Sequence, residues 1–155
     1  MNETDFPNTV SPAEPLELQE VLTRYIDSRN GYSQAADLVE EAGLASTFRS
    51  ISGRRALIAK RLAGLIDMEG ETPDLSGSPE AGIHRWWIRL KEKFSKQETK
   101  SVITECLRGE RELARTLNEA LEHGHLEPSH STILRDALAE VDLAIGAFEG
   151  VIEEH

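Results

Sequence analysis

The sequence has 155 residues, a length that suits one domain. Its composition, with 39% hydrophobic and 29% charged residues, is typical of a globular protein with a substantial core. Aromatic residues make up only 5%, which argues against a β-sandwich or barrel, and the net charge of −11 disfavours binding to nucleic acid or to acidic membrane surfaces. No apolar run approaches the roughly 20 residues that a membrane-spanning helix needs.

The beginning of the sequence predicts a flexible tail over residues 1–11, followed by a single domain over 12–155. The tail is polar and carries neither the basic nor the apolar segment of a signal peptide. Cys106 is the single cysteine, so no intramolecular disulfide can form, and we expect it to be a small core residue rather than a catalytic thiol. Together these features predict a cytoplasmic location.

A first long helix is predicted over about 12–41. Ser11, Pro12 and Glu14 form a capping box, in which the serine caps the helix, the proline begins it and the glutamate bonds back. We expect Gly43 to end this helix, because glycine readily adopts the backbone conformation found after a helix.

A second helix is predicted over about 45–69, with Gly70 after its end. Gly53 lies inside it and is a candidate for a close approach between helices, since glycine weakens a helix by about 1 kcal/mol relative to alanine. Residues 70–78 have the composition of a loop, and a short extra helix should follow over about 78–94.

The short helix carries His84, Trp86 and Trp87. The two tryptophans point about 100° apart on a helix, so core packing and contact with a partner both stay open. We treat all three residues as candidates for an interaction surface, with His84 expected to pack and hydrogen-bond rather than to act as a general base.

Two more amphipathic helices are predicted over about 98–122 and 129–153. Four long helices with two tight connections and one long crossover indicate an all-α, ferritin-like four-helix bundle, with the short extra helix in the crossover between the second and third long helices. A three-helix bundle with a loose helical hairpin is the alternative.

Several stretches together resemble a bacterial ferritin-like four-helix-bundle family of unknown function, over about residues 16–154. They are Gly31-Tyr32, Arg55, Ile83-His84-Arg85-Trp86 and Glu105-Cys106-Leu107-Arg108-Gly109-Glu110. The resemblance implies a ferritin-like fold and a cytosolic, stress-associated role, and it brings no known reaction. Family members carry Glu in place of Arg29 and of Arg61, and His near Ile145, so any metal site of the relatives is expected to be disabled here.

The sequence also lacks the usual ligands of a di-iron bundle, which include Glu-x-x-His on two helices. The single example is Glu127-Pro-Ser-His130, at a helix start rather than mid-bundle. His123, His125 and His130 cluster between the last two helices and are weak candidates for Zn²⁺ or Ni²⁺ ligands, with an exposed polar turn as the simpler interpretation. We predict no cofactor.

Each long helix carries one charged residue on its apolar stripe, namely Arg29, Arg55, Glu110 and Glu140. A buried charge without a partner is costly, so we expect these four to form an Arg–Glu network at mid-bundle, where a related protein would hold metal. The alternative is that one or more of them lies at the edge of its stripe and reaches water.

Three functions follow as hypotheses. The first is a non-enzymatic module that acts through protein contacts, as a homodimer or with an unknown partner. The second is a carboxylate-bridged iron or manganese protein, supported by fold analogy and the acidic composition. The third is a small-molecule binder that uses a gap between helices, for which the sequence offers no distinguishing feature.

Overall fold

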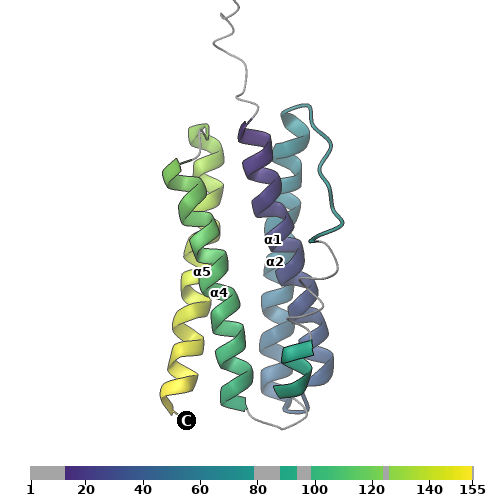
Figure 1. Ribbon diagram of the computed structural model, residues 1–155, viewed down its shortest axis with the longest axis vertical. Helices are drawn as coiled ribbons and strands as arrows, with labels where there is room; N and C mark the ends of the chain where they lie inside the picture. Colours follow the sequence, from purple (N-terminus) through teal and green to yellow (C-terminus); the bar gives the residue numbers. More distant parts are fainter. Residues whose placement is uncertain (1–12, 79–87, 94–98, 124–125, 155) are drawn as a thin grey trace, which may run out of the picture.

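The computed structural model describes residues 13–78, 88–93, 99–123 and 126–154, which are drawn as ribbons in Figure 1. The long helices in these ranges are α1 (Ala13–Leu38), α2 (Ala42–Met68), α4 (Thr99–His123) and α5 (Pro128–Glu154). Residues 88–93 are also helical, and no strand occurs in the described ranges. The predicted all-α class is therefore confirmed for this part of the chain. The expected tail and residues 79–87 lie outside it.

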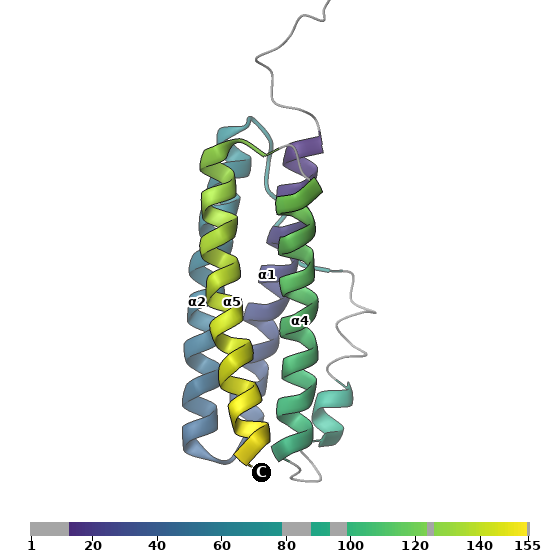
Figure 2. The same cartoon turned by 90° about the vertical axis from the view of Figure 1, so that its left-hand side faces the viewer.

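The four long helices form one elongated bundle (Figures 1 and 2). α1 and α2 make one antiparallel hairpin and α4 and α5 make another, while α1 also packs against α4. α2 and α4 run in the same direction along the bundle (Figure 1). None of the described helices is long and apolar enough to cross a membrane.

The junction between α1 and α2 corrects the expectation for Gly43. α1 ends at Leu38 and α2 begins at Ala42, so Gly43 lies in the first turn of α2. The Glu41 carboxylate caps this helix by accepting hydrogen bonds from the backbone N–H groups of Gly43, at 2.6 Å, and Leu44, at 3.0 Å. A side-chain cap thus sets the boundary, rather than a glycine at the end of α1.

Gly53 does not mark a close approach between helices. It is exposed on α2, and a Cβ placed on it would meet no atom within 4 Å. The expectation was wrong because a glycine inside a helix is compatible with either a tight contact or an open face.

The described part of the crossover is fastened to α1. The Gln19 side chain donates to the Asp74 carbonyl at 3.0 Å and accepts from the Asp74 N–H at 2.9 Å. The Asp27 carboxylate accepts from both the Ser78 N–H, at 2.9 Å, and the Ser78 hydroxyl. Gly77, with φ +84°, supplies the left-handed backbone conformation just before Ser78.

The core consists of two clusters of buried apolar side chains stacked along the bundle. One includes Tyr25, Ile58 and Leu113, and the other includes Tyr32, Ile51 and Leu107. Arg55 lies on α2 between the positions that contribute Ile51 and Ile58 to the two clusters. A polar layer therefore separates two apolar halves at mid-bundle.

Candidate functional site

The guanidinium of Arg55 forms the centre of this polar layer. Its side chain is 0% exposed. Its Nε donates a hydrogen bond to Glu140 Oε1 at 2.9 Å. Its Nη1 donates to Ser28 Oγ and to Glu110 Oε2, at 2.9 Å each. Its Nη2 donates to Glu110 Oε1 at 2.6 Å and to Glu140 Oε2 at 3.2 Å. These five bonds match the five N–H donors of a guanidinium, so the buried cation is fully hydrogen-bonded.

Two carboxylates from the second hairpin hold the arginine from different helices. Glu110 of α4 is buried, and its Oε2 also accepts the Tyr32 hydroxyl at 2.8 Å. Glu140 of α5 is partly exposed and also accepts from Nε of Arg54 at 3.3 Å. Each carboxylate receives two bonds from Arg55, a two-point geometry that favours planar guanidinium over lysine.

Two tyrosines from α1 enclose the guanidinium. The Tyr25 and Tyr32 ring centroids each lie 5.8 Å from Cζ of Arg55, within the range of a cation–π contact. The Tyr25 hydroxyl donates to the Ala137 carbonyl at 3.3 Å, which ties α1 to α5. Ser28 and both tyrosines therefore give α1 a share in the layer.

The surroundings shift several pKa values. Burial alone would lower the pKa of the Arg55 guanidinium, but the hydrogen bond and charge of Glu110, together with Glu140, outweigh burial and raise it above its ordinary value. Burial raises the pKa of both tyrosine hydroxyls. Burial, with the negative charge of Glu110 nearby, also raises the pKa of the Cys106 thiol, so the reactive thiolate is disfavoured.

Arg29 was expected to belong to the Arg–Glu network, but its side chain does not join this layer. Its side chain is partly exposed, and its Nε donates to the side chain of its neighbour Asn30 at 3.1 Å. Ser28, one position earlier, faces Arg55 instead. A helical stripe is wide enough to contain both positions, so spacing alone did not choose between them. Arg29 is thus at the edge of its stripe, as the alternative interpretation allowed.

Sequence reasoning also missed the polar roles of Ser28 and Tyr32. Tyr32 was on the predicted apolar stripe of α1, but its hydroxyl was not assigned a partner. The available signal was the spacing of Tyr25, Ser28 and Tyr32, which puts all three on one face of a helix. A buried tyrosine hydroxyl usually needs a hydrogen-bond partner, so Glu110 was a candidate acceptor.

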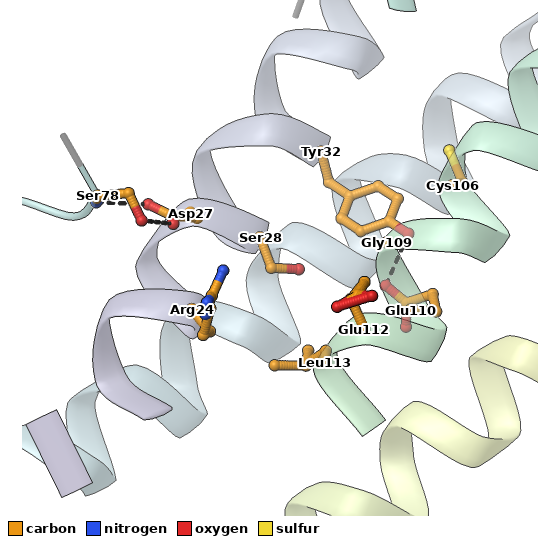
Figure 3. Close-up of a pocket in the computed structure, with 10 residues that line it drawn as sticks. All are labelled: Arg24, Asp27, Ser28, Tyr32, Ser78, Cys106, Gly109, Glu110, Glu112 and Leu113. Carbon is orange, nitrogen blue, oxygen red and sulfur yellow. Dashed lines mark hydrogen bonds between the residues drawn. The ribbon is translucent and has the colours of Figure 1, made fainter. Parts of the chain in front are cut away.

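A cavity of about 280 Å³ opens beside the layer, between α1 and α4 (Figure 3). Tyr32, Glu110 and Cys106 line it on one side, and Arg24 and Asp27 line it on the other. Glu110 already accepts hydrogen bonds from Arg55 and Tyr32, so the cavity borders the layer without containing an unbonded carboxylate.

The remaining candidates are only partly described. His84, Trp86, Trp87 and His125 lie outside the described residues, and His123 is the last residue of α4. His130 is buried near the start of α5, with its Nε2 3.4 Å from Glu69 Oε1. Of the three histidines expected to cluster, only the side chain of His130 is described. Its described neighbours are the carboxylates of Glu69 and Glu127.

The family described as "Domain of unknown function (DUF2383)" matches residues 15–123, which include α2 with Arg55 and α4 with Glu110. No curated protein and no solved structure matches the chain. Because the match spans well over half of the sequence, this chain belongs to the DUF2383 family of proteins of unknown function.

Proposed function

We propose that this protein is a ferritin-like helical bundle without a di-metal centre at mid-bundle, and that it acts by binding protein, as a homodimer, rather than by catalysis. The observation that carries the proposal is the Arg55 guanidinium, bonded on both sides to Glu110 and Glu140 in the middle of the bundle. A bacterial, cytoplasmic and stress-associated setting is supported by the sequence resemblance alone.

Charge is the first argument against a central metal centre. Di-iron bundles use carboxylates and histidines to neutralise two cations. Here Arg55 already neutralises one of the two central carboxylates, and Arg54 reaches Glu140 from outside. A metal ion between Glu110 and Glu140 would have to take the place of the Arg55 guanidinium. The displaced guanidinium would remain close to the ion, and the repulsion between two positive charges at short range is unfavourable.

The order of the helices supports ferritin-like connectivity. Two antiparallel hairpins are joined so that α2 and α4 run the same way, which requires one long crossover rather than three short loops (Figure 1). The fold alone does not imply iron chemistry, since one scaffold serves many functions.

The surface of α2 and α5 supports self-association. Leu57 of α2 is 66% exposed and Leu143 of α5 is 77% exposed, although both are large and apolar. Leu57 is three residues after Arg54, and Leu143 is three residues after Glu140, so each shares a helix side with a member of the Arg54–Glu140 ion pair. We call this surface the α2–α5 face.

The α2–α5 face is also suited to pairing with a copy of itself. Arg54 and Arg61 on α2 are ion-paired with Glu140 and Asp136 on α5, so the two helices carry opposite charges. In a two-fold dimer, the same patch meets itself, and a basic row on one subunit can face the acidic row of the other. The exposed leucine between Arg54 and Arg61 would then be covered.

Light scattering after size-exclusion chromatography tests this proposal. We expect the wild type to elute as a dimer and the Leu57→Glu/Leu143→Glu variant as a folded monomer. Leu75→Glu is the matched control, because Leu75 is 60% exposed but lies in the loop after α2. A monomeric wild type, or a dimer that the double variant leaves intact, would contradict self-association through this face.

Metal analysis of untagged protein separates the proposal from the iron or manganese alternative. We expect no metal content that depends on Glu110. Two ions per chain in the wild type, lost in Glu110→Gln, would overturn the proposal. A single ion that survives Glu110→Gln would belong elsewhere in the molecule.

A further inference from the structure

The end of α2 and the start of α5 lie at the same end of the bundle (Figure 1). Three side chains of the kind that bind metals meet there. Glu69 is the C-cap of α2, and Glu127 immediately precedes the first residue of α5. His130 follows Glu127 by three residues, and the Ser131 N–H bonds to the Glu127 carbonyl in the first turn. The start of α5 therefore turns the Glu127 and His130 side chains to the same side.

The separations of the potential ligand atoms are close to those of a coordination sphere. His130 Nε2 lies 3.4 Å from Glu69 Oε1 and 3.9 Å from Glu127 Oε2, and one ligand atom from each residue falls within 4.8 Å of the others. Zinc bonds of about 2.0–2.2 Å to nitrogen and oxygen imply ligand separations of about 3.3–3.6 Å in a tetrahedron. His130 and Glu69 already meet this range, and Glu127 needs only a small side-chain rotation.

Burial makes the cluster a defined site rather than a loose surface group. His130 is only 4% exposed and the Glu69 side chain 8%, whereas the Glu127 side chain is 54% exposed. Two ligands are thus fixed by packing, and the third closes the site from the solvent side. Two carboxylates would neutralise the charge of a divalent ion, and imidazole suits first-row transition metals.

We propose that Glu69, Glu127 and His130 bind one divalent transition-metal ion, with Zn²⁺ as the best match to a ligand set of one histidine and two carboxylates. A water molecule would complete a four-coordinate site on the exposed side. The ion would connect the end of α2 to the start of α5 and so join the two hairpins. This site lies apart from Arg55 and does not rest on the proposed function.

Titration calorimetry of the full-length, untagged, EDTA-treated protein with ZnCl₂ tests the site. We expect one Zn²⁺ per chain and binding at least 10-fold weaker in Glu127→Gln, whose exposed side chain can be changed without disturbing the core. His130→Gln should weaken binding by at least as much. The midpoint of thermal unfolding should rise with ZnCl₂ in the wild type and not in His130→Gln, because a ligand that binds only the folded state stabilises it.

Two controls make the result decisive. Glu119→Gln changes an exposed carboxylate elsewhere on α4 and should bind Zn²⁺ like the wild type. A His123→Gln/His125→Gln variant tests the neighbouring histidines of the sequence. Binding that survives Glu127→Gln and His130→Gln but is lost in this double variant would overturn the assignment. So would a wild type whose Kd for Zn²⁺ is weaker than about 100 µM, which would leave only the contact between His130 and Glu69.

Discussion

Arg55 keeps its charge inside the bundle because Glu110 and Glu140 supply acceptors for the guanidinium from two other helices. Burying these ions costs hydration free energy, and their attraction only roughly offsets that cost. The benefit we expect is specificity, since all these bonds form at a single helix register. Removing one charged partner should lower the stability far more than replacing the whole set with apolar residues, because it leaves a buried charge with fewer partners.

Glu110→Gln should lower the free energy of unfolding by about 1.5–3 kcal/mol, the range for a hydrogen bond to a charged group, because Arg55 then keeps only Glu140 as a counter-charge. Urea denaturation followed by circular dichroism measures this change. Arg29→Gln is the matched control and should change stability by less than about 0.5 kcal/mol, since Arg29 lies outside the layer.

A double substitution isolates the coupling between the two charges. Arg55→Met/Glu110→Leu should destabilise the protein by less than the sum of its single substitutions, because no fully buried charge then remains alone. Additive effects would show that Arg55 and Glu110 do not stabilise each other.

The two tyrosines predict the response to alkaline pH. Both pKa values are raised, chiefly by burial, so the folded state keeps the phenol protons when the unfolded chain loses them above its ordinary pKa of 10.0. Their contribution to stability is complete below pH 10 and declines as the pH rises further. We expect tyrosinate absorbance at 295 nm to appear together with loss of helical circular dichroism.

The unfolded protein in urea is the reference for this titration. Its tyrosines should ionise near pH 10, and since the chain has only two, the signal reports directly on the layer. Ionisation near pH 10 in a fully helical native protein would show that the hydroxyls are accessible to solvent.

At the level of the helices, periodicity was sufficient to predict four long segments and the face that each one buries. The inward stripes contained Arg55 and Glu110, and both side chains are buried in the structure. Periodicity did not separate Ser28 from Arg29, because neighbouring positions at the edge of a stripe differ by only about 100°. The cap at Glu41 was also missed, since glutamate is not among the residues usually preferred there.

The open position of Gly53 gives a prediction about α2. Gly53→Ala should stabilise the protein by about 0.5–1 kcal/mol, because alanine favours the helix and its methyl group meets nothing within 4 Å. Chemical denaturation measures the effect.

Gly77→Ala provides the contrast for this prediction. Gly77 has φ +84°, and an added Cβ would lie 3.0 Å from Asp27 Oδ1, so this variant should be destabilised. Equal effects at the two positions would contradict the assignment of Gly53 to an open helix face.

In the whole molecule, the polar layer divides the core into two apolar clusters and connects all four long helices. The two antiparallel helix hairpins were predictable from the short connections within them. The pairing of side chains between helices distant in the sequence was not. Glu69 and His130 illustrate this limit, since they are 61 positions apart and meet only because α2 ends where α5 begins. Contacts of that kind depend on helix register, which a periodic pattern in one helix does not contain.

The central claim is that an arginine, not a metal ion, holds the two carboxylates at mid-bundle. Anomalous diffraction from crystals grown with MnCl₂ or ZnCl₂ tests it most directly, because it locates both the side chains and any bound ion. We predict guanidinium density between Glu110 and Glu140 and no anomalous peak there, whatever is found beside His130. An anomalous peak between the two carboxylates, with Arg55 turned away, would contradict the account.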